Sequence, residues 1–343
     1  MSMNAPTGSP RSGLDLLEAE MARQHADALT SLRGNAEVAA RIAASVMLGR
    51  RLLLIGMGAS HYANHMLEPL YRRLGIDAWA CTAAELMHTP PPAMPRTAIF
   101  VSQSGESGEI IELLKRDAAG EDRFGMTLDP SSTLGRTLPC LVGAGGSEVA
   151  FAATRSLMVT LALHGALLAA LGQANRDSVD SLQRPVIPLL DDALDALAGK
   201  TTIVFAGRGI FRGVAEAGSL MLMELARIPT LGFEIGQFRH GPLELLSPEI
   251  GVVLLCGAEA DRAAVASLAQ AAADAGSTAV VFDCSGGTPV AGAVNLAFSP
   301  RQDLAAVFSI LPALQRLIIS IATRKVDRVG EPIRSTKITR EAS

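Results

Sequence analysis

The sequence has few aromatic residues and no basic run, and these two shortages exclude nucleic acid as a partner. Aromatic side chains make up 4% of the 343 residues, with one tryptophan, so the chain lacks the stacking platforms that single strands require. The net charge is −4 at pH 7, which argues against a binder of phosphate backbones. Any phosphate that the protein binds should therefore be held locally, in one pocket.

Cysteine is also scarce, and its spacing predicts neither a zinc site nor a disulfide framework. The cysteines form no C-x-x-C pair and lie in or beside apolar runs. We therefore expect buried free thiols at Cys81, Cys140, Cys256 and Cys284. No motif requires a metal or another cofactor, and we expect neither.

A signal peptide and a membrane-spanning run are missing as well. Residues 1–13 are rich in Ser, Pro and Gly and contain no apolar core. The longest apolar stretch, residues 156–171, carries His164, and we interpret it as a buried helix rather than a membrane span. The sequence thus predicts a soluble, cytoplasmic protein with no membrane partner.

The chain is rich in hydrophobic residues, at 49%, and they form alternating strand and helix patterns. A length of 343 residues favours two domains. Short apolar runs predict buried parallel strands at residues 51–55, 76–80, 97–101, 124–128, 141–142, 201–205, 230–233, 251–255 and 277–282. Helical spacing predicts helices at residues 14–33, 35–48, 61–74, 108–115, 148–171, 188–197, 214–227, 261–275 and 307–323. This alternation predicts an α/β fold.

Two glycine pairs mark an internal duplication. Gly56 and Gly58, like Gly207 and Gly209, follow a predicted strand and precede a predicted helix. The third glycine of a dinucleotide fingerprint is absent from both copies, and no acidic residue ends the strand that follows the first pair. A nicotinamide cofactor is therefore not expected.

The loop S-Q-S-G-E-S, residues 102–107, lies between a predicted strand and a predicted helix. Free N–H groups and the dipole of a helix N-terminus both favour an anion there. Hydroxyl and amide side chains add neutral donors suited to a phosphate monoester, and Gly105 lets the backbone approach the ligand. The alternative is an ordinary serine-rich helix cap.

Together with the doubled unit and this loop, two further motifs resemble those of the SIS (sugar isomerase) family. They are the block G-Q-F-R-H-G-P at residues 236–242 and a tail with Asp327, Pro332, Arg334 and Lys337. The family includes the isomerase half of glucosamine-6-phosphate synthase. The resemblance implies two tandem flavodoxin-like SIS subdomains, each a parallel sheet flanked by helices. The implied boundaries are 1–34 for an N-terminal helical segment, 35–178 and 179–325 for the subdomains, and 326–343 for a closing tail.

The resemblance also implies the residues that bind the substrate. The serine loop holds the sugar phosphate in the family, which assigns that role to Ser102, Gln103, Ser104 and Ser107. A first loop that contacts the sugar falls on Gly58, Ala59 and Ser60, where Ala59 replaces a threonine. A further contact falls on Ala153, which replaces a serine in the stretch S-E-V-A-F-A-A-T.

Three catalytic roles follow from the resemblance. Glu224 occupies the position of the general base, and burial in an apolar helix would raise its pKa toward neutrality. The alternative is a surface ion pair of Glu224 with Arg227, and Glu216 or Glu244 could assist the base. His240 matches the histidine that opens the sugar ring, on a loop that reaches into a neighbouring subunit and so implies a homodimer with a shared site. Lys337 matches the tail lysine that closes over the sugar.

One departure from the family bears on the reaction. The synthase captures its ketose substrate with a lysine one helical turn before the base, and Met221 stands there in this chain. No amidotransferase segment precedes the match in these residues, which favours the direction that releases ammonia. We therefore expect a glucosamine-6-phosphate deaminase acting on a phosphorylated amino sugar. The alternatives are a fructosamine-6-phosphate deglycase, another phosphosugar isomerase, or a non-catalytic phosphosugar sensor.

Overall fold

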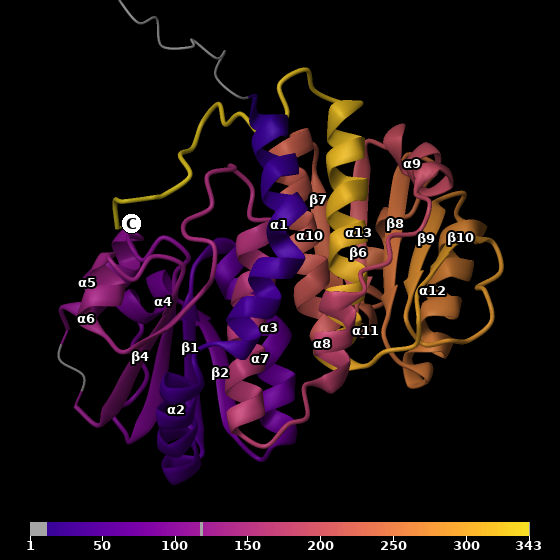
Figure 1. The fold of residues 1–343 in the computed structure, drawn as a ribbon. Coiled ribbons are helices and arrows are strands. Elements are labelled where there is room, and N and C mark those ends of the chain that lie inside the picture. Colours follow the sequence, from indigo (N-terminus) through magenta and orange to yellow (C-terminus); the bar gives the residue numbers. More distant parts are fainter. Residues whose placement is uncertain (1–11, 117–118, 343) are drawn as a thin grey trace, which may run out of the picture.

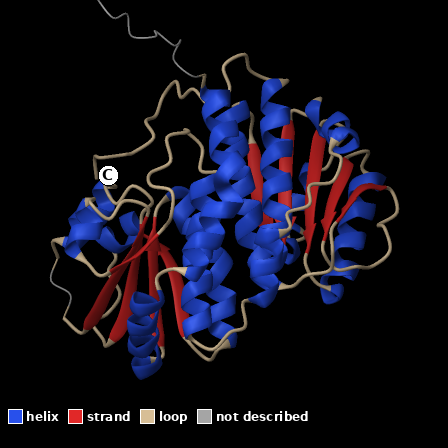
Figure 2. Ribbon diagram, viewed as in Figure 1, coloured by secondary structure: helices blue, strands red, loops and turns tan. Residues whose placement is uncertain are grey.

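Two parallel five-stranded sheets form the frame of the protein (Figures 1 and 2). A computed structural model describes residues 12–116 and 119–342. The first sheet has the order β2 (Asp77–Thr82), β1 (Arg51–Gly56), β3 (Arg96–Val101), β4 (Glu121–Thr127) and β5 (Cys140–Val142). The second has the order β7 (Thr230–Glu234), β6 (Thr202–Gly207), β8 (Ile250–Cys256), β9 (Thr278–Asp283) and β10 (Ala293–Ala297).

The identical order of the two sheets confirms the duplication that the glycine pairs indicated. Counted within each unit, both follow 2-1-3-4-5, the flavodoxin-like order. The first strand of each unit ends in a tight turn whose glycine has a positive φ, 50° at Gly58 and 57° at Gly209. The fold is α/β with two tandem units, each a parallel sheet flanked by helices, as the resemblance implied. Both sheets fall within the predicted ranges 35–178 and 179–325, although the boundaries themselves stay predictions.

A layer of long helices separates the two sheets and contains the main core (Figure 2). It is formed by α1 (Gly13–Arg33), α3 (Gly58–Arg73), α7 (Arg155–Ala170), α10 (Ile210–Ala226) and α13 (Asp303–Thr323). Among the described residues, α13 alone is long and apolar enough to cross a membrane, but 83% of its most apolar window is buried inside the protein. It is therefore the central helix of this core, with α8 (Arg176–Gln183) and α9 (Asp191–Ala198) packed on it.

Shorter helices cover the outer faces of the sheets and enclose two smaller apolar clusters. The first sheet is covered by α4 (Ala83–His88), α5 (Gly108–Leu114) and α6 (Thr133–Thr137), and the second by α11 (Ile235–Phe238) and α12 (Arg262–Asp274). The helix α2 (Ala36–Gly49) packs on the inner side of the first sheet. Short 3₁₀ turns lie at Pro242–Leu245 and Glu259–Asp261.

Several predicted element boundaries are wrong. The helix predicted at 148–171 begins only at Arg155, because the backbone before it wraps around the side chain of Glu148, which accepts hydrogen bonds from Thr154 and Ser156. The helix predicted from residue 188 begins at Asp191, and the one predicted from residue 214 begins at Ile210. The sequence patterns missed β10 and the short helices α4, α6, α8 and α11.

The four cysteines are free, as predicted. Cys81, Cys256 and Cys284 are buried, whereas Cys140 is half-buried, and burial raises the pKa of all four thiols to about 12. They are therefore packing residues rather than nucleophiles. Of the predicted N-terminal segment 1–34, residues 1–11 lie outside the described part of the chain.

Candidate active site

A cavity of about 350 Å³ opens at the carboxyl ends of the first sheet's strands. It lies where the loops after β1 and β3 diverge, the switch point at which open α/β sheets bind ligands. The predicted site residues in its wall are Gly58, Ala59, Ser60, Ser102, Gln103, Ser104, Ser107, Ala153, Glu224 and Lys337. The structure therefore brings residues from both subdomains and the tail to one cavity.

The serine loop is fixed by its own hydrogen bonds and by α6. Ser102 Oγ accepts a hydrogen bond from Gly105 N at 3.1 Å and lies 3.1 Å from Ser107 Oγ. Glu106 accepts from the N–H and the hydroxyl of Thr133. Gly105 has a φ of 66°, and a Cβ there would lie 2.0 Å from Ser132 Oγ. A side chain at position 105 would therefore clash with the start of α6, and the left-handed backbone conformation there also favours glycine.

The tail takes one of the donors that the sequence assigned to an anion. Gly108 N, the first N–H of α5, donates to Thr339 O at 3.0 Å. Residues 335–339 line the same cavity, so the tail lies over the loop. The chain itself therefore occupies part of the helix N-terminus at which the sequence analysis expected an anion. The Gly108 N–H is thus not available to a ligand while the tail lies in this position.

Gln103 provides a buried donor toward the cavity. Its Oε1 accepts a hydrogen bond from Ser156 Oγ at 2.6 Å, which orients the amide. Its Nε2 is buried and has no partner among the described residues. An unpaired buried N–H is costly, and a bound phosphate oxygen would satisfy it.

Lys337 and Glu148 form an ion pair inside the cavity. Lys337 Nζ lies 3.1 Å from Glu148 Oε2 and donates to Phe151 O at 3.3 Å. The side chain of Glu148 is 1% exposed and is held by Thr154 and Ser156. The pair holds the ammonium group of an otherwise exposed tail at the cavity, and the role of Lys337 toward the sugar stays a prediction.

Glu224 contacts the cavity from the second subdomain, on α10. Burial raises its pKa to about 7, and the charge of Glu148 adds to this, while the charge of Lys337 opposes it. The alternative role as a partner of Arg227 does not hold. In the described part of the chain, no ion pair joins the two, and Arg227 Nη2 donates to Glu331 O at 2.8 Å. A carboxyl group with a pKa near 7 suits proton transfer at neutral pH.

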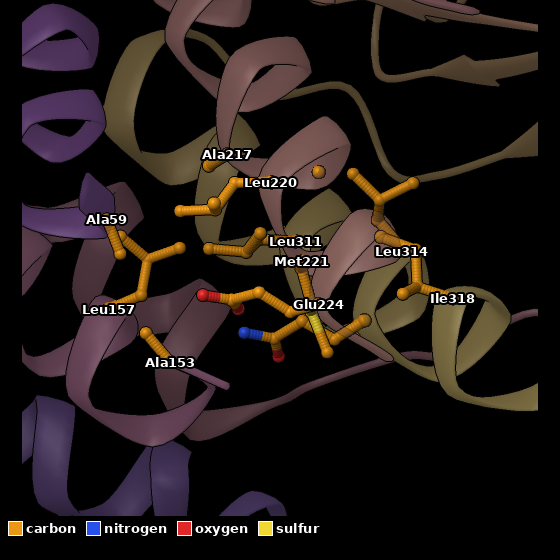
Figure 3. A pocket seen from close by; sticks show the side chains of 12 residues that line it. Ala59, Ala153, Leu157, Ala217, Leu220, Met221, Glu224, Leu311, Leu314 and Ile318 are labelled. Carbon is orange, nitrogen blue, oxygen red and sulfur yellow. The ribbon is translucent and has the colours of Figure 1, made fainter. Parts of the chain in front are cut away.

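A second, small cavity of about 10 Å³ lies beside Glu224 (Figure 3). In Figure 3 the carboxylate extends toward Ala59, Ala153 and Leu157, among apolar side chains from α10 and α13. Met221 lines this cavity too, at the position where the synthase has its lysine. Apart from the amide of Gln315, the side chains that line this small cavity beside the carboxylate are apolar, and the resulting burial is the main cause of its raised pKa.

Comparison with known proteins supports this architecture. The model of the SIS domain matches residues 196–314. Residues 196–314 of this chain are a SIS domain. The glutamine–fructose-6-phosphate aminotransferase of Gloeobacter violaceus is 31% identical over 229 residues, 60% of this chain and 37% of the relative. That of Thermosynechococcus vestitus is 28% identical over 322 residues, 82% of this chain and 50% of the relative. The chain thus spans half or less of these relatives.

Solved structures show the double-SIS fold over nearly the whole chain. The C-terminal domain of glucosamine-fructose-6-phosphate aminotransferase from Francisella tularensis has a TM-score of 0.79 at 17% identity and covers 94% of this chain and 98% of its own. Glucosamine-6-phosphate deaminase from Thermotoga maritima has a TM-score of 0.75 at 18% identity and covers 94% and 99%. Tagatose-6-phosphate ketose/aldose isomerase from Escherichia coli has a TM-score of 0.78 at 20% identity and covers 96% and 100%.

His240 is the one predicted site residue that this SIS chain does not bring to the cavity. It follows α11, is exposed, and is not found among the described residues that line the site. Glu216 pairs with His65 and Arg212, and Glu244 lies in a 3₁₀ turn, and neither is among the described residues that line the cavity of this chain. The ring-opening role of His240 stays a prediction that requires a second chain.

Glu148 and Ser156 are polar groups of the site that the sequence did not single out. Ser156 Oγ lies within hydrogen-bond distance of both Gln103 and Glu148, so it links the serine loop to the ion pair of Glu148 with Lys337. A buried Arg155, paired with Glu20 of α1 and donating to Gly146 O, anchors the same stretch. Most of these contacts join segments that are far apart in the sequence, so local patterns do not reveal them. The one available signal was the stretch S-E-V-A-F-A-A-T, residues 147–154, which contains Glu148. Among the described residues, no His, Cys, Asp or Glu cluster is placed to hold a metal.

Proposed function

We propose that the protein is a phosphosugar isomerase of the SIS family. The observation that carries this proposal is that Glu224, with a pKa near 7, faces the cavity walled by the serine loop. A carboxylate that is half-protonated near neutrality can take a proton from one carbon and return it to the next. A phosphate held by Ser102, Gln103 and Ser107 would keep the sugar carbons at a fixed distance from that base.

We further propose that the substrate is glucosamine 6-phosphate, which is converted with water to fructose 6-phosphate and ammonia. His240 of a neighbouring subunit opens the pyranose by moving a proton from the anomeric hydroxyl to the ring oxygen. Glu224 removes the C2 proton to give an enolamine, and protonation at C1 gives a ketimine. Water adds to the C=N bond, and the resulting carbinolamine loses ammonia to leave the ketone. Met221 in place of an amine supports a route without covalent ketose capture.

A second substrate class remains open because of two alanines. Ala59 and Ala153 stand beside Glu224 where the family has hydroxyls, and both line the cavity. A wall without these hydroxyls would suit a changed or larger substituent, as in a fructosamine-6-phosphate deglycase or an isomerase of another amino-sugar phosphate. The third reading, a phosphosugar sensor, would need the pocket but not the base.

The test is ammonia release from glucosamine 6-phosphate, with fructose 6-phosphate detected in the same reaction. Equal amounts of the two products support the deaminase. Turnover of fructoselysine 6-phosphate, or of galactosamine 6-phosphate, in its place would support the alternative substrates. Thermal stabilisation by these phosphosugars without any turnover would favour the sensor.

The activity should depend on pH with one acidic limb from Glu224. A general base must be ionised, so kcat/KM should fall about tenfold per pH unit below pH 7 and level off above it. Initial rates at low substrate concentration between pH 5 and 9 would measure this limb. A limb near the ordinary value of 4.5 would contradict the assignment.

Lys337→Met should move that limb to higher pH. The ammonium group of Lys337 lowers the pKa of Glu224, whereas Glu148 raises it, so removing the lysine leaves the raising effects unopposed. We also expect a roughly tenfold loss in kcat/KM from the lost contact with substrate. The matched control is Lys325→Met, since Lys325 Nζ donates to Lys200 O away from the cavity. An unchanged limb in Lys337→Met would show that the tail does not lie over the base in solution.

A further inference from the structure

A second hollow lies on the outer face of the first sheet and takes no part in the proposed reaction. The helices on this face are short, with six residues in α4, seven in α5 and five in α6, against 16 in α3 and in α7 on the inner face. They leave part of the sheet to be covered by the Pro-rich loop after α4. A cavity of about 230 Å³ remains there, with Leu53, Ile55 and Phe100 of the strands at its floor. We call it the outer hollow.

Among the described residues, three arginines and one glutamate are the charged groups that line the outer hollow. They are Arg96, Arg116, Arg123 and Glu121. Glu121 pairs with two of them, with Oε1 2.9 Å from Arg96 Nε and Oε2 3.3 Å from Arg123 Nε. Side-chain exposure is 9% for Arg96 and 17% for Arg123. The hollow therefore has an excess of positive charge in a partly desolvated place, where an anion is favoured.

Each guanidinium group is anchored by some of its nitrogens and leaves others unused. Arg96 Nη2 donates to Pro92 O, Arg123 Nη1 to Arg116 O, and Arg116 Nη1 to Met87 O. Among the residues that the structure describes, no hydrogen bond involves Arg96 Nη1, Arg123 Nη2 or Arg116 Nη2. Arginines fixed in this way lose little side-chain entropy when an anion takes the free donors.

We propose that the outer hollow binds a small organic anion with a flat apolar body, of the aryl carboxylate class. The carboxylate would accept from the free arginine donors, as charge-assisted hydrogen bonds. The ring would pack on Leu53, Ile55 and Phe100, beside the guanidinium of Arg123, which lies 5.6 Å from the Phe100 ring centre. A volume of 230 Å³ is below the range of drug-sized pockets, so the ligand has about one ring.

The position of the hollow connects it to the serine loop. Phe100 is on β3, which leads directly into Ser102, and Leu113 of the same hollow is on α5, which begins at Gly108. A ligand there packs on the two elements that hold the loop, and not on α10, which carries Glu224. Provided that the proposed function holds, occupancy should change KM for the phosphosugar more than kcat.

The experiment uses 4-fluorobenzoate, observed by fluorine NMR with the full-length protein, and 4-fluorobenzamide as the neutral probe of equal shape. We expect saturable binding of the acid and none of the amide. Arg116→Gln and Arg123→Gln should each weaken it about tenfold, the loss of one charge-assisted hydrogen bond. Arg41→Gln, which changes an exposed arginine of α2, is the matched control. Because Arg123 also supports the fold, we add a second variant, Ala93→Trp. Its indole side chain should fill the hollow and prevent binding of the probe while the arginines stay in place.

The outcomes separate the site from its effect. Binding lost in Ala93→Trp and weakened in the arginine variants, but kept in Arg41→Gln, supports the site. Absence of saturable binding, or binding that Ala93→Trp does not change, overturns it. If the probe binds in the hollow and KM for the phosphosugar does not move, the coupling to the serine loop is overturned. The binding assay does not depend on turnover. An inactive protein would contradict the proposed function, but binding of 4-fluorobenzoate to the outer hollow could still be measured.

Discussion

Replacing Glu224 with glutamine is expected to lower kcat/KM for glucosamine 6-phosphate by about 10³-fold, the usual contribution of a general base. Glutamine has nearly the same shape and cannot accept the C2 proton. The serine loop belongs to the other subdomain, so the substrate should still bind. Ammonia release measures the loss, and thermal stabilisation by glucosamine 6-phosphate measures the retained binding.

The same variant should also be more stable than the parent at high pH. The pKa of Glu224 is raised from 4.5 to about 7, so the folded chain holds this proton more tightly than the unfolded chain does. Folding stability therefore falls as pH rises from about 4.5 to 7, and the full penalty applies above 7. Glutamine carries no such penalty, so the gain in melting temperature of Glu224→Gln should be larger at pH 8 than at pH 5.

The matched control is Glu37→Gln, at an exposed position of α2. It should change neither the rate nor the pH dependence of stability. If Glu224→Gln kept its activity, the base would lie elsewhere. If it lost activity without the pH-dependent gain in stability, the carboxylate would not be desolvated as its position beside Ala59 and Ala153 requires.

The sequence predicted the parts of the fold that depend on local pattern. Continuous apolar runs such as Leu52–Ile55 are typical of strands covered on both faces, and they were placed correctly. The start of α7 was not, because residues 148–154 carry apolar side chains that resemble a helix. Their backbone is held instead by the Glu148 carboxylate and by Arg155, whose partner Glu20 is on α1. A contact 135 residues away leaves no local signal.

The same distinction applies to the candidate site. The serine loop and the turn at Gly58 lie at strand–helix junctions, and such junctions are visible in the sequence. That Lys337 reaches Glu148, and that Thr339 caps α5, depends on how the tail folds back, which local patterns do not encode. Glu224 was selected by resemblance, and its apolar surroundings were indicated by the Met and Leu neighbours on α10. The orientation of the Gln103 amide could not be predicted from the sequence, because it is set by the hydrogen bond from Ser156, 53 residues away.

A mixture of two inactive variants, Glu224→Gln and His240→Asn, is expected to recover about a quarter of the parent activity. His240 is exposed on its own chain and lies outside the cavity that contains Glu224. If it acts in a partner's site, a mixed dimer has one site with both changes and one site with neither. Half of the dimers in a statistical mixture are mixed, and half of their sites are intact, which gives the quarter.

The control for this experiment pairs Glu224→Gln with a Ser102→Ala, Ser104→Ala double variant. Glu224 and the serine loop line one cavity of one chain, so neither site of that mixed dimer is intact and no activity should return. Co-expression with two affinity tags would isolate the mixed species and measure each pair at equal dimer concentration. Recovery in the first pair alone would place His240 in the partner's site. Failure of both pairs, with mixed dimers present, would mean that His240 reaches Glu224 within its own chain after the loop moves, whereas full activity of His240→Asn alone would mean that His240 has no part in the reaction.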